Sequence, residues 1–381
     1  MDGHIYQRRK TFTYVVDLPK DPVTGKRRQK TKGRFKTEKE ARRAMRKFIV
    51  QLEEGEYLEP SKELFSEFIL NWFNEHYSKR IKATTAESRR YTVKKHLIEG
   101  NPFANNTLDT ITAHDIDSLY NTKLDAEYST SYIRKIHQLL TKAFDQAVKW
   151  NKIKENPAKK ADPPCIKREE MRIWSFEHIH RFLDESTGER TFPIFYLALY
   201  TGMRRGEILG LMWKDIDFDK KVIHVKRTLS FVPKKGYIFT SPKTARSKRQ
   251  IPVSNEVIQV LQQVQQTQRE WKKRLQDAYE DNDLVFCTEL GKPQDPQNIL
   301  RVMRRLIEGA GVTRIRFHDL RHTHASILLN NNVDIVKVSA RLGHANPRVT
   351  LEIYAHLLPN NQSEVPEVFE DLMKRNLKEP R

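Results

Sequence analysis

The sequence predicts a multidomain α+β protein: a small N-terminal sheet plus a helix, an all-helical middle domain, and a mainly helical C-terminal domain with a small antiparallel sheet. Three observations predict this class. The 381 residues exceed what one hydrophobic core usually organises. β-forming runs occur near the N-terminus and within residues 222–253, whereas apolar residues recur at helical spacing elsewhere. Segments 55–62 and 156–165, which are rich in proline, glycine or charge, interrupt the helical pattern.

These breaks divide the chain into domains. We predict one domain at residues 1–58, a second at 63–158, a linker at 159–172 and a third at 173–381 with a C-terminal tail. The linker contains a proline pair, which favours a semi-extended backbone.

In the first domain, the β-formers of residues 11–17 are followed by a turn signal at 21–25 and a returning strand at 26–35. Thr37 is placed to cap the helix that follows, with Glu40 three residues later. Apolar residues recur at helical spacing from there to Leu52, so this helix can cover one face of the sheet.

The second domain has four helical stretches, at residues 65–73, 91–98, 116–119 and 133–148. Their aromatic side chains are expected to form a core. The third domain opens with helices at 176–183 and 192–200. Strands follow at 222–225, 237–240 and 250–253, and then a Gln-rich helix and several shorter helices.

The charge of the chain favours a polyanionic partner. The formal net charge is +20, a bias that solubility alone rarely requires and that nucleic acid explains. It is concentrated in residues 8–47, which hold 16 Lys or Arg against 4 Asp or Glu.

The compartment is predicted from what the sequence lacks. Cys165 and Cys287 are far apart and not in metal-ligand spacing, which is typical of a reducing compartment. The N-terminus has no apolar signal region, and no run approaches the roughly 20 apolar residues that span a bilayer. We expect a cytoplasmic protein with no membrane partner.

The first candidate site residue is Arg204, in the segment Thr-Gly-Met-Arg. Gly202 permits a tight turn there, and an arginine at a helix start forms an anion site together with the free backbone amides. The alternative is a surface arginine paired with Glu207 or Asp215. Arg205 competes with Arg204 for the same role.

His318 and Arg321 are three residues apart, so on a helix they share a face and can address one phosphate. The neighbouring His322 and His324 allow a zinc cluster as an alternative, but no cysteine is nearby. We expect these two histidines to serve in packing or in support of the site residues.

A third group of candidate site residues lies between Gly343 and Tyr354. Gly343 is positioned to end a helix, and Asn346 and Pro347 to start another. His344 lies between these signals and Tyr354 follows them, so this tyrosine is a candidate nucleophile rather than an ordinary amphipathic residue.

A departing oxygen needs a proton, which a lysine on a loop can supply. Lys243 occupies a predicted hairpin between two strand signals, and Lys234, Lys235 and Lys248 compete with it; a simple contact to a DNA phosphate is the alternative.

Other kinds of site are not favoured by the sequence. The alternating carboxylates of residues 215–219 are more often solvated than bound to magnesium. No nucleotide-binding lysine loop, serine elbow or His-Glu-x-x-His segment is present in the sequence.

At these residues the chain resembles the tyrosine recombinase family, specifically integrases of phages and conjugative elements from Gram-positive bacteria. The resemblance extends over nearly the whole chain and is strongest in three blocks: residues 201–217 (TGMRRGEILGLMWKDID), 317–329 (FHDLRHTHASILL) and 342–358 (LGHANPRVTLEIYAHLL).

The resemblance implies a role for each candidate. Tyr354 would attack the scissile phosphate and form a 3′-phosphotyrosyl bond, while Arg204 and Arg321 hold its non-bridging oxygens. His318 would accept or share the tyrosine proton, and His344 would stabilise the transition state.

The family also implies that Lys243 protonates the leaving 5′-hydroxyl and that Glu207 supports the helix of Arg204. Because the phosphotyrosine conserves the energy of the broken bond, no cofactor and no metal are implied. The reaction would be site-specific recombination that integrates and excises a mobile element. A type IB topoisomerase and a non-enzymatic DNA-binding regulator are the alternatives.

The resemblance further implies that the first domain is an arm-type DNA-binding domain, a three-stranded sheet with one helix, and that the second is a helical, SAM-like core-binding domain. The basic residues expected to contact DNA in the first domain are Arg8, Arg9, Lys10, Lys26, Arg27, Arg28, Lys30, Lys32 and Arg34.

The implied partners are double-stranded DNA with core and arm attachment sites, a homotetramer in the synapse, an excisionase and a host DNA-bending protein. The apolar stripe from Val365 to Met373 is expected to pack either on a neighbouring protomer or within its own chain.

Overall fold

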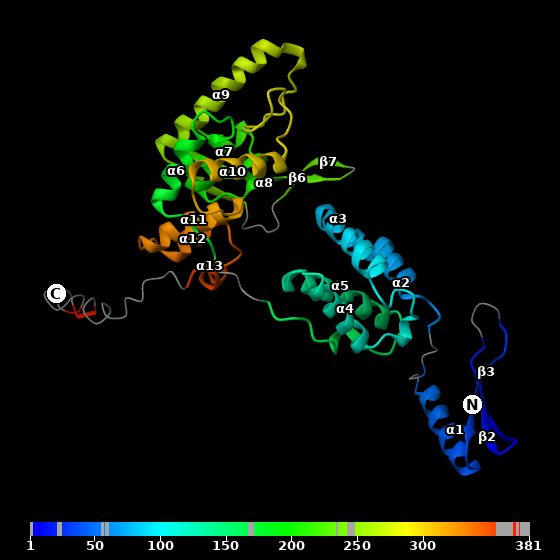
Figure 1. The fold of residues 1–381 in the computed structure, drawn as a ribbon. Coiled ribbons are helices and arrows are strands. Elements are labelled where there is room, and N and C mark those ends of the chain that lie inside the picture. Colours follow the sequence, from blue (N-terminus) through cyan, green and yellow to red (C-terminus); the bar gives the residue numbers. More distant parts are fainter. Residues whose placement is uncertain are drawn as a thin grey trace, which may run out of the picture. The chain divides into compact units, whose positions relative to one another are not determined.

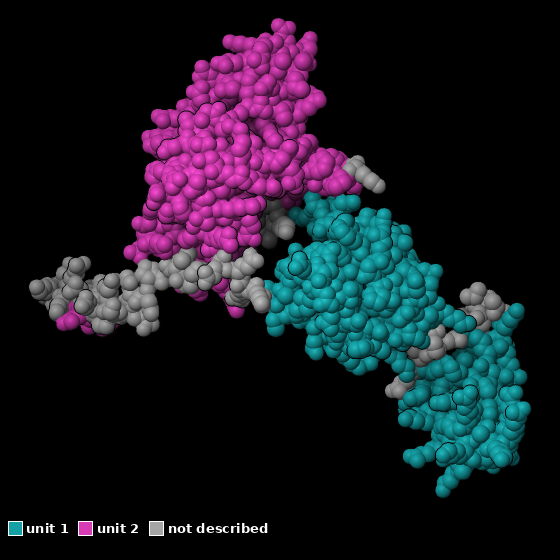
Figure 2. Space-filling model, viewed as in Figure 1, with its two compact units in different colours: residues 1–168 teal, residues 169–381 magenta. Residues whose placement is uncertain are grey.

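The computed structural model describes residues 3–20, 25–54, 57, 61–166, 171–233, 235–241, 248–355, 369–370 and 373. It comprises two compact units, Met1–Arg168 and Glu169–Arg381 (Figure 2). Apart from Gly25, the predicted turn at residues 21–25 lies outside the described residues, as does most of the tail stripe.

Unit 1 begins with a three-stranded antiparallel sheet and one helix (Figure 1). Its elements are β1 (Gly3–Arg8), β2 (Thr11–Leu18), β3 (Arg28–Phe35) and α1 (Glu38–Glu53). Thr37 caps α1 by accepting a hydrogen bond from the backbone N–H of Glu40, and the Glu40 carboxylate accepts from the N–H of Lys36. Tyr14, Val16 and Phe48 form the core between sheet and helix. The predicted sheet and capped helix are confirmed.

The remainder of unit 1 is helical. Its elements are α2 (Phe65–Asn71), the π-helical turn η1 (Trp72–Tyr77), the 3₁₀ turn η2 (Ser78–Arg80), α3 (Ala83–Thr92), the π-helical turn η3 (Val93–Glu99), the 3₁₀ turn η4 (Leu108–Thr110), α4 (Ala113–Asp125), α5 (Thr130–Lys149) and the 3₁₀ turn η5 (Pro157–Lys159). The aromatic residues of the first stretch are buried as predicted, with Phe65 between Phe103 and Phe144. This core is separate from that of the sheet.

The described residues of unit 2 are mainly helical with two small sheets. Its helices are α6 (Phe176–Ser186), α7 (Phe192–Thr201), α8 (Arg205–Leu209), α9 (Asn255–Leu275), α10 (Pro296–Ala310), α11 (Phe317–Asn330), α12 (Ile335–Leu342) and α13 (Pro347–Tyr354), with 3₁₀ turns η6 (Trp213–Asp215) and η8 (Gln276–Ala278). Its strands are β4 (Ile216–Asp217), β5 (Val222–Val225), β6 (Thr228–Val232), β7 (Gly236–Thr240) and β8 (Arg249–Pro252). The mixed α+β class is therefore confirmed.

The predicted hairpin between the strands now called β7 and β8 is wrong. β7 pairs with β6, whereas β8 pairs with β5 in the antiparallel order β4-β5-β8. β6 was missed in the sequence, although Leu229 and Val232 bury their side chains. Gly236, at a φ of 74°, permits the tight return into β7. The segment that contains Lys243 thus joins two different sheets.

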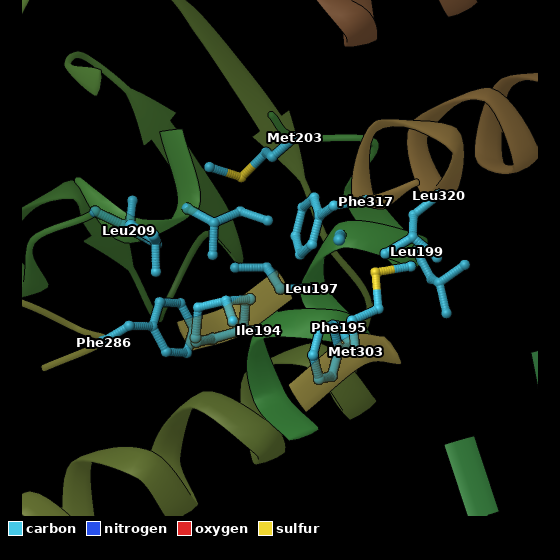
Figure 3. Close-up of a cluster of buried hydrophobic side chains, with 14 of the residues drawn as sticks. Ile194, Phe195, Leu197, Leu199, Met203, Leu209, Phe286, Met303, Phe317 and Leu320 are labelled. Carbon is cyan, nitrogen blue, oxygen red and sulfur yellow. The ribbon is translucent and has the colours of Figure 1, made fainter. Parts of the chain in front are cut away.

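The core of unit 2 fixes the helices that carry the candidate residues. Figure 3 shows Phe195 and Leu197 of α7 in one buried cluster with Phe317 and Leu320 of α11. Phe317 lies directly before His318, and Leu320 lies directly before Arg321. Because the two apolar side chains are fixed in the core, they set the direction in which the polar side chains of α11 point. In the described part of the chain no helix is both long and apolar enough to cross a membrane.

Candidate active site

Arg204 and Arg249 share one buried carboxylate. Glu207 Oε1 accepts a hydrogen bond from Arg204 Nη1 at 2.8 Å, and Glu207 Oε2 accepts from Arg249 Nη2 at 2.9 Å. The Glu207 and Arg249 side chains are 3% and 5% exposed, whereas that of Arg204 is 38% exposed. Glu207 thus holds one side of Arg204 and leaves the remaining donors of its guanidinium accessible. Arg205 is directed elsewhere, to the carbonyl of Pro296.

The charges around Glu207 decide its protonation. Burial alone would raise the pKa of its carboxyl, but Arg249 and then Arg204 outweigh this and lower the pKa below its ordinary value. Glu207 is therefore a stable anion in the site.

Sequence reasoning missed Arg249. A signal was available, because Arg249 and Ile251 lie two apart on β8 and so share the face on which Ile251 is fully buried. An arginine on that face requires a buried partner. Its Nε also donates to the carbonyl of Arg341 at 2.6 Å, which connects β8 to α12.

Arg321 lies 2% exposed and is anchored by backbone oxygens. Its Nη1 donates to the carbonyl of Gly202 at 2.7 Å and its Nη2 to the carbonyl of Leu342 at 2.6 Å. Burial lowers the pKa of Arg321 to about 9, with the charges of Arg204 and Arg249 contributing further, so the guanidinium is still charged near neutral pH.

Gly202 explains how this anchor is possible. Its φ is 65°, and a Cβ there would lie 2.8 Å from side-chain atoms of His324 and Leu342. A residue with a side chain would therefore move the carbonyl that Arg321 uses.

His324 serves a structural network, as predicted. Its Nδ1 donates to the carbonyl of Leu199 at 2.7 Å and its Nε2 accepts from Arg341 Nε at 3.1 Å. Arg341 also donates to the carbonyls of Pro252 and Tyr200, so it ties α12 to β8 and α7.

Both ring nitrogens of His324 are thus engaged, which argues against the zinc alternative for the histidines of α11. Among the described residues, no three His, Cys, Asp or Glu side chains are grouped to hold a metal ion. The expectation of a solvated Asp215 is wrong, because this carboxylate is 1% exposed and pairs with Arg227 and Lys226.

His344 lies in the turn between the end of α12 and the start of α13. Gly343 ends α12 with a φ of 69°, and Asn346 caps α13 by accepting from the N–H of Val349, with Pro347 at the first position. The predicted end and start signals are confirmed. His344 Nδ1 lies 2.8 Å from the hydroxyl of buried Thr350. When Thr350 donates this hydrogen bond, the proton of His344 is on Nε2 and can be donated to a phosphate oxygen.

Tyr354 is the last residue of α13 and has no exposed surface. Its hydroxyl lies 2.6 Å from Nδ1 of His322. Burial raises the pKa of Tyr354 to about 12, although the nearby charge of Arg321 acts in the opposite direction. The contact with His322 was not predicted from the sequence.

These side chains converge on one place. Burial lowers the pKa of His344 to about 4, and the charges of Arg321, Arg204 and Arg249 add to the effect. The His318 ring is partly exposed, but loss of surrounding water and then the charges of His322, Arg321 and Arg204 lower its pKa to about 4. Both histidines are therefore neutral near pH 7. Three cationic guanidiniums against one carboxylate make a cluster of charge suited to a phosphate.

Lys243 lies outside the described residues, as does Lys234. Lys235 and Lys248 are exposed. The role of Lys243 stays a prediction.

The pairing of the N-terminal strands separates the nine basic residues predicted to contact DNA. Lys30 pairs with Val16 and Lys32 with Tyr14, so both lie on the face that α1 covers, on the outer strand β3. Arg8, paired with Thr11, lies on the opposite face; we call this the open face because α1 does not cover it, although Thr13 and Val15 of the central strand are buried there. Arg27 donates to Asp17 in an exposed ion pair.

Comparisons with known proteins agree with this architecture. Residues 4–52 match the model of an arm DNA-binding domain, residues 64–124 that of the N-terminal SAM-like domain of phage integrases, and residues 172–361 that of the phage integrase family.

Among similar proteins, a XerC-like tyrosine recombinase of Caldanaerobacter subterraneus subsp. tengcongensis is 33% identical over 282 residues, which are 70% of this chain and 72% of the relative. The ICEBs1 integrase of Bacillus subtilis is 26% identical over 94% of this chain and 97% of its own. The fold also resembles that of the Tn1549 transposon integrase in complex with a circular intermediate DNA, with a TM-score of 0.68 and 20% identity over 81% of this chain and 99% of that one.

Proposed function

The chain belongs to the phage integrase family of tyrosine recombinases, and we propose that it integrates and excises a mobile element by joining Tyr354 covalently to DNA. The observation that carries this proposal is the convergence of Tyr354, Arg321, Arg204 and His344 from α13, α11, the start of α8 and the α12–α13 turn. One site of one chain therefore combines a phenol with cationic donors.

In the proposed reaction, Tyr354 Oη attacks the phosphorus and the bond to the 5′-oxygen breaks. The free donors of Arg204 and Arg321 and the Nε2–H of His344 stabilise the charge that grows on the non-bridging oxygens. His318, which is partly exposed beside Arg321, is placed to donate to the same phosphate. Lys243 is the proposed proton donor to the leaving oxygen.

The burial of Tyr354 has a consequence for the order of events. A side chain with no exposed surface cannot meet a phosphate until its cover is displaced. We therefore propose that DNA binding precedes a local opening around α13 in which the contact between Tyr354 and His322 is kept, so that the nucleophile is shielded from water until a substrate is present.

We also propose functions for the parts of the chain outside this site. Residues 1–58 would bind arm sites and 63–158 a core site, linked by 159–172 to the catalytic domain at 173–381. The separate cores of the sheet and the helical part of unit 1 support the first boundary.

Partners follow from the same reaction. Two duplexes, each cut on both strands, need four copies of Tyr354, so the active assembly would be a homotetramer. The same proposal includes an excisionase, a host bending protein and action in the bacterial cytoplasm.

The test is a suicide substrate, a core-site duplex with a nick beside the scissile phosphate, incubated with the full chain without added metal. We expect a covalent protein–DNA product with the wild type and none with Tyr354→Phe, while both proteins bind the duplex alike. A covalent product from Tyr354→Phe would rule out Tyr354 as the nucleophile. Joining of two defined duplexes, rather than relaxation of any supercoiled circle, would separate recombination from topoisomerase activity.

A further inference from the structure

His322 is in contact with the atom that reacts. Its Nδ1 lies 2.6 Å from Oη of Tyr354, although the two residues are 32 positions apart in the sequence. The imidazole ring is half-buried on α11, and its centroid lies 5.7 Å from that of the phenol.

The other histidine of this face lies differently. The His318 ring stands edge-on to His322 at 5.0 Å, and within the described part of the chain it makes no hydrogen bond. It is more exposed than His322 and is influenced by the charges of Arg204 and Arg321. His318 therefore lies within the influence of both arginines proposed to hold the phosphate, whereas His322 contacts the nucleophile.

The alternative for His322 is a purely structural hydrogen bond. A structural role would be satisfied by any acceptor, whereas proton transfer requires a group that is neutral before the reaction and can hold a proton after it. An imidazole meets both conditions near neutral pH.

We propose that His322, rather than His318, takes the proton from Tyr354 during DNA cleavage; this inference rests on the proposed role of Tyr354. The proton moves from Oη to Nδ1 of His322 as Oη bonds to phosphorus and the bond from phosphorus to O5′ breaks. O5′ takes its proton from a separate acid, for which Lys243 is the proposed donor. When an incoming 5′-hydroxyl reverses the reaction, the phosphotyrosine oxygen leaves and recovers the proton from His322.

The surroundings of His322 support this role. The titratable and charged groups that face or influence it are His318, Asp319, Arg321 and Arg316 from α11 and its start, Tyr354 from α13, and His344 from the α12–α13 turn. Burial lowers the pKa of His322; Asp319 acts to raise it, while Arg321 and Arg316 act to lower it. The ring is consequently neutral near pH 7 and holds a lone pair for the phenol proton. Cleavage should then slow as the pH falls through the pKa of His322.

The experiment compares His322→Asn with His318→Asn in single-turnover cleavage of the nicked core duplex by the full chain. The amide oxygen introduced by His322→Asn would lie near the place of the imidazole Nδ1, so this variant can keep the hydrogen bond but cannot take up the proton. We expect cleavage to fall by roughly 10²–10⁴-fold with DNA affinity unchanged. His318→Asn should also slow cleavage but retain the decline at acidic pH, which His322→Asn should lose.

A second substrate, with sulfur in place of the bridging 5′-oxygen, separates the two proton transfers. A thiolate leaves without protonation, so this substrate should compensate for loss of the leaving-group acid but not for His322→Asn. Cleavage by His322→Asn at the wild-type rate, or its full recovery with the sulfur substrate, would overturn the proposal. If Tyr354→Phe is inactive in the same assay, that result leaves the proposed function intact; a covalent product from Tyr354→Phe would instead refute the function itself.

Discussion

The candidate active site of unit 2 and the sheet of unit 1 use charge in opposite ways. In the site, Glu207, Arg249 and Arg321 are at most 5% exposed, and each makes hydrogen bonds to defined partners. In the sheet, Arg8, Arg9 and Lys32 are exposed, and the described residues provide them with no ion pair.

The difference separates two tasks. A buried charge is expensive to desolvate and persists only in one geometry, which suits the positioning of a single phosphate. An exposed charge stays hydrated when its side chain moves, so its movement costs little free energy. A set of such charges attracts a DNA backbone with an affinity that depends on salt. Substitutions should therefore act on stability and catalysis in unit 2, and on DNA affinity in unit 1.

The largest effect is expected from Glu207→Gln. Loss of this charge leaves Arg249 buried without a carboxylate, which should lower the free energy of unfolding by roughly 3–5 kcal/mol and abolish cleavage. The matched control is Glu289→Gln, since Glu289 also pairs with two arginines, Arg190 and Arg274, but is 50% exposed. Urea unfolding should show a change of about 1 kcal/mol or less for this control. Equal losses in the two variants would remove the distinction between buried and exposed charge.

A smaller effect is expected from the pH dependence of stability. Burial, and then the charge of Arg341, lower the pKa of His324 from 6.5 to about 4. As the pH falls, the unfolded chain therefore binds this proton at a higher pH than the folded chain does. The stabilising contribution of His324 is complete above its pKa in the unfolded chain and is lost as the pH falls toward its pKa in the folded chain. His324 alone should contribute a loss of about 2 kcal/mol between about pH 7 and about pH 5.

The measurement is urea unfolding at several pH values, for the wild type and for His324→Asn. The variant should be less stable near neutral pH, because it loses the hydrogen bond from Arg341, and should show a shallower decline in acid. An identical decline in both proteins would contradict the assignment of this titration to His324.

The sequence was sufficient for those features that depend on local signals. Thr37, Gly343 and Asn346 were predicted to cap or end helices because the signals lie within four residues of the backbone groups they serve. The apolar periodicity likewise located α5, α7 and the strand β5. The grouping of Arg204, Arg321, His344 and Tyr354 came from their resemblance to a family rather than from spacing.

Features that depend on distant contacts could not be predicted. The contact of His322 with Tyr354 exists only because α13 returns to α11, and no local pattern determines that approach. The pairing of β8 with β5 follows from β6 and β7 forming their own sheet, which the missed strand β6 concealed. Arg249 could be predicted only in part. The alternation of side chains along the strand indicates that Arg249 points to the buried face, but it does not identify Glu207 as the partner.

The smallest expected effect distinguishes the two faces of the N-terminal sheet. Arg8 lies on the open face and Lys32 on the face that α1 covers, although both were predicted to contact DNA. If the open face meets the DNA, Arg8→Ala should weaken arm-site binding and reduce the salt slope by about 1, while Lys32→Ala changes the slope less.

Titration of an arm-site duplex at several salt concentrations measures both slopes, with thermal unfolding as the control for folding. Neither variant should alter the unfolding transition, because both side chains are exposed. A larger slope change for Lys32→Ala would place the DNA along the outer strand β3, which carries Arg28, Lys30, Lys32 and Arg34. Unchanged slopes in both variants would mean that arm-site affinity does not arise from the exposed charges of this sheet. The sheet and the buried active site would then differ in the exposure of their charges but not in the functions proposed for them.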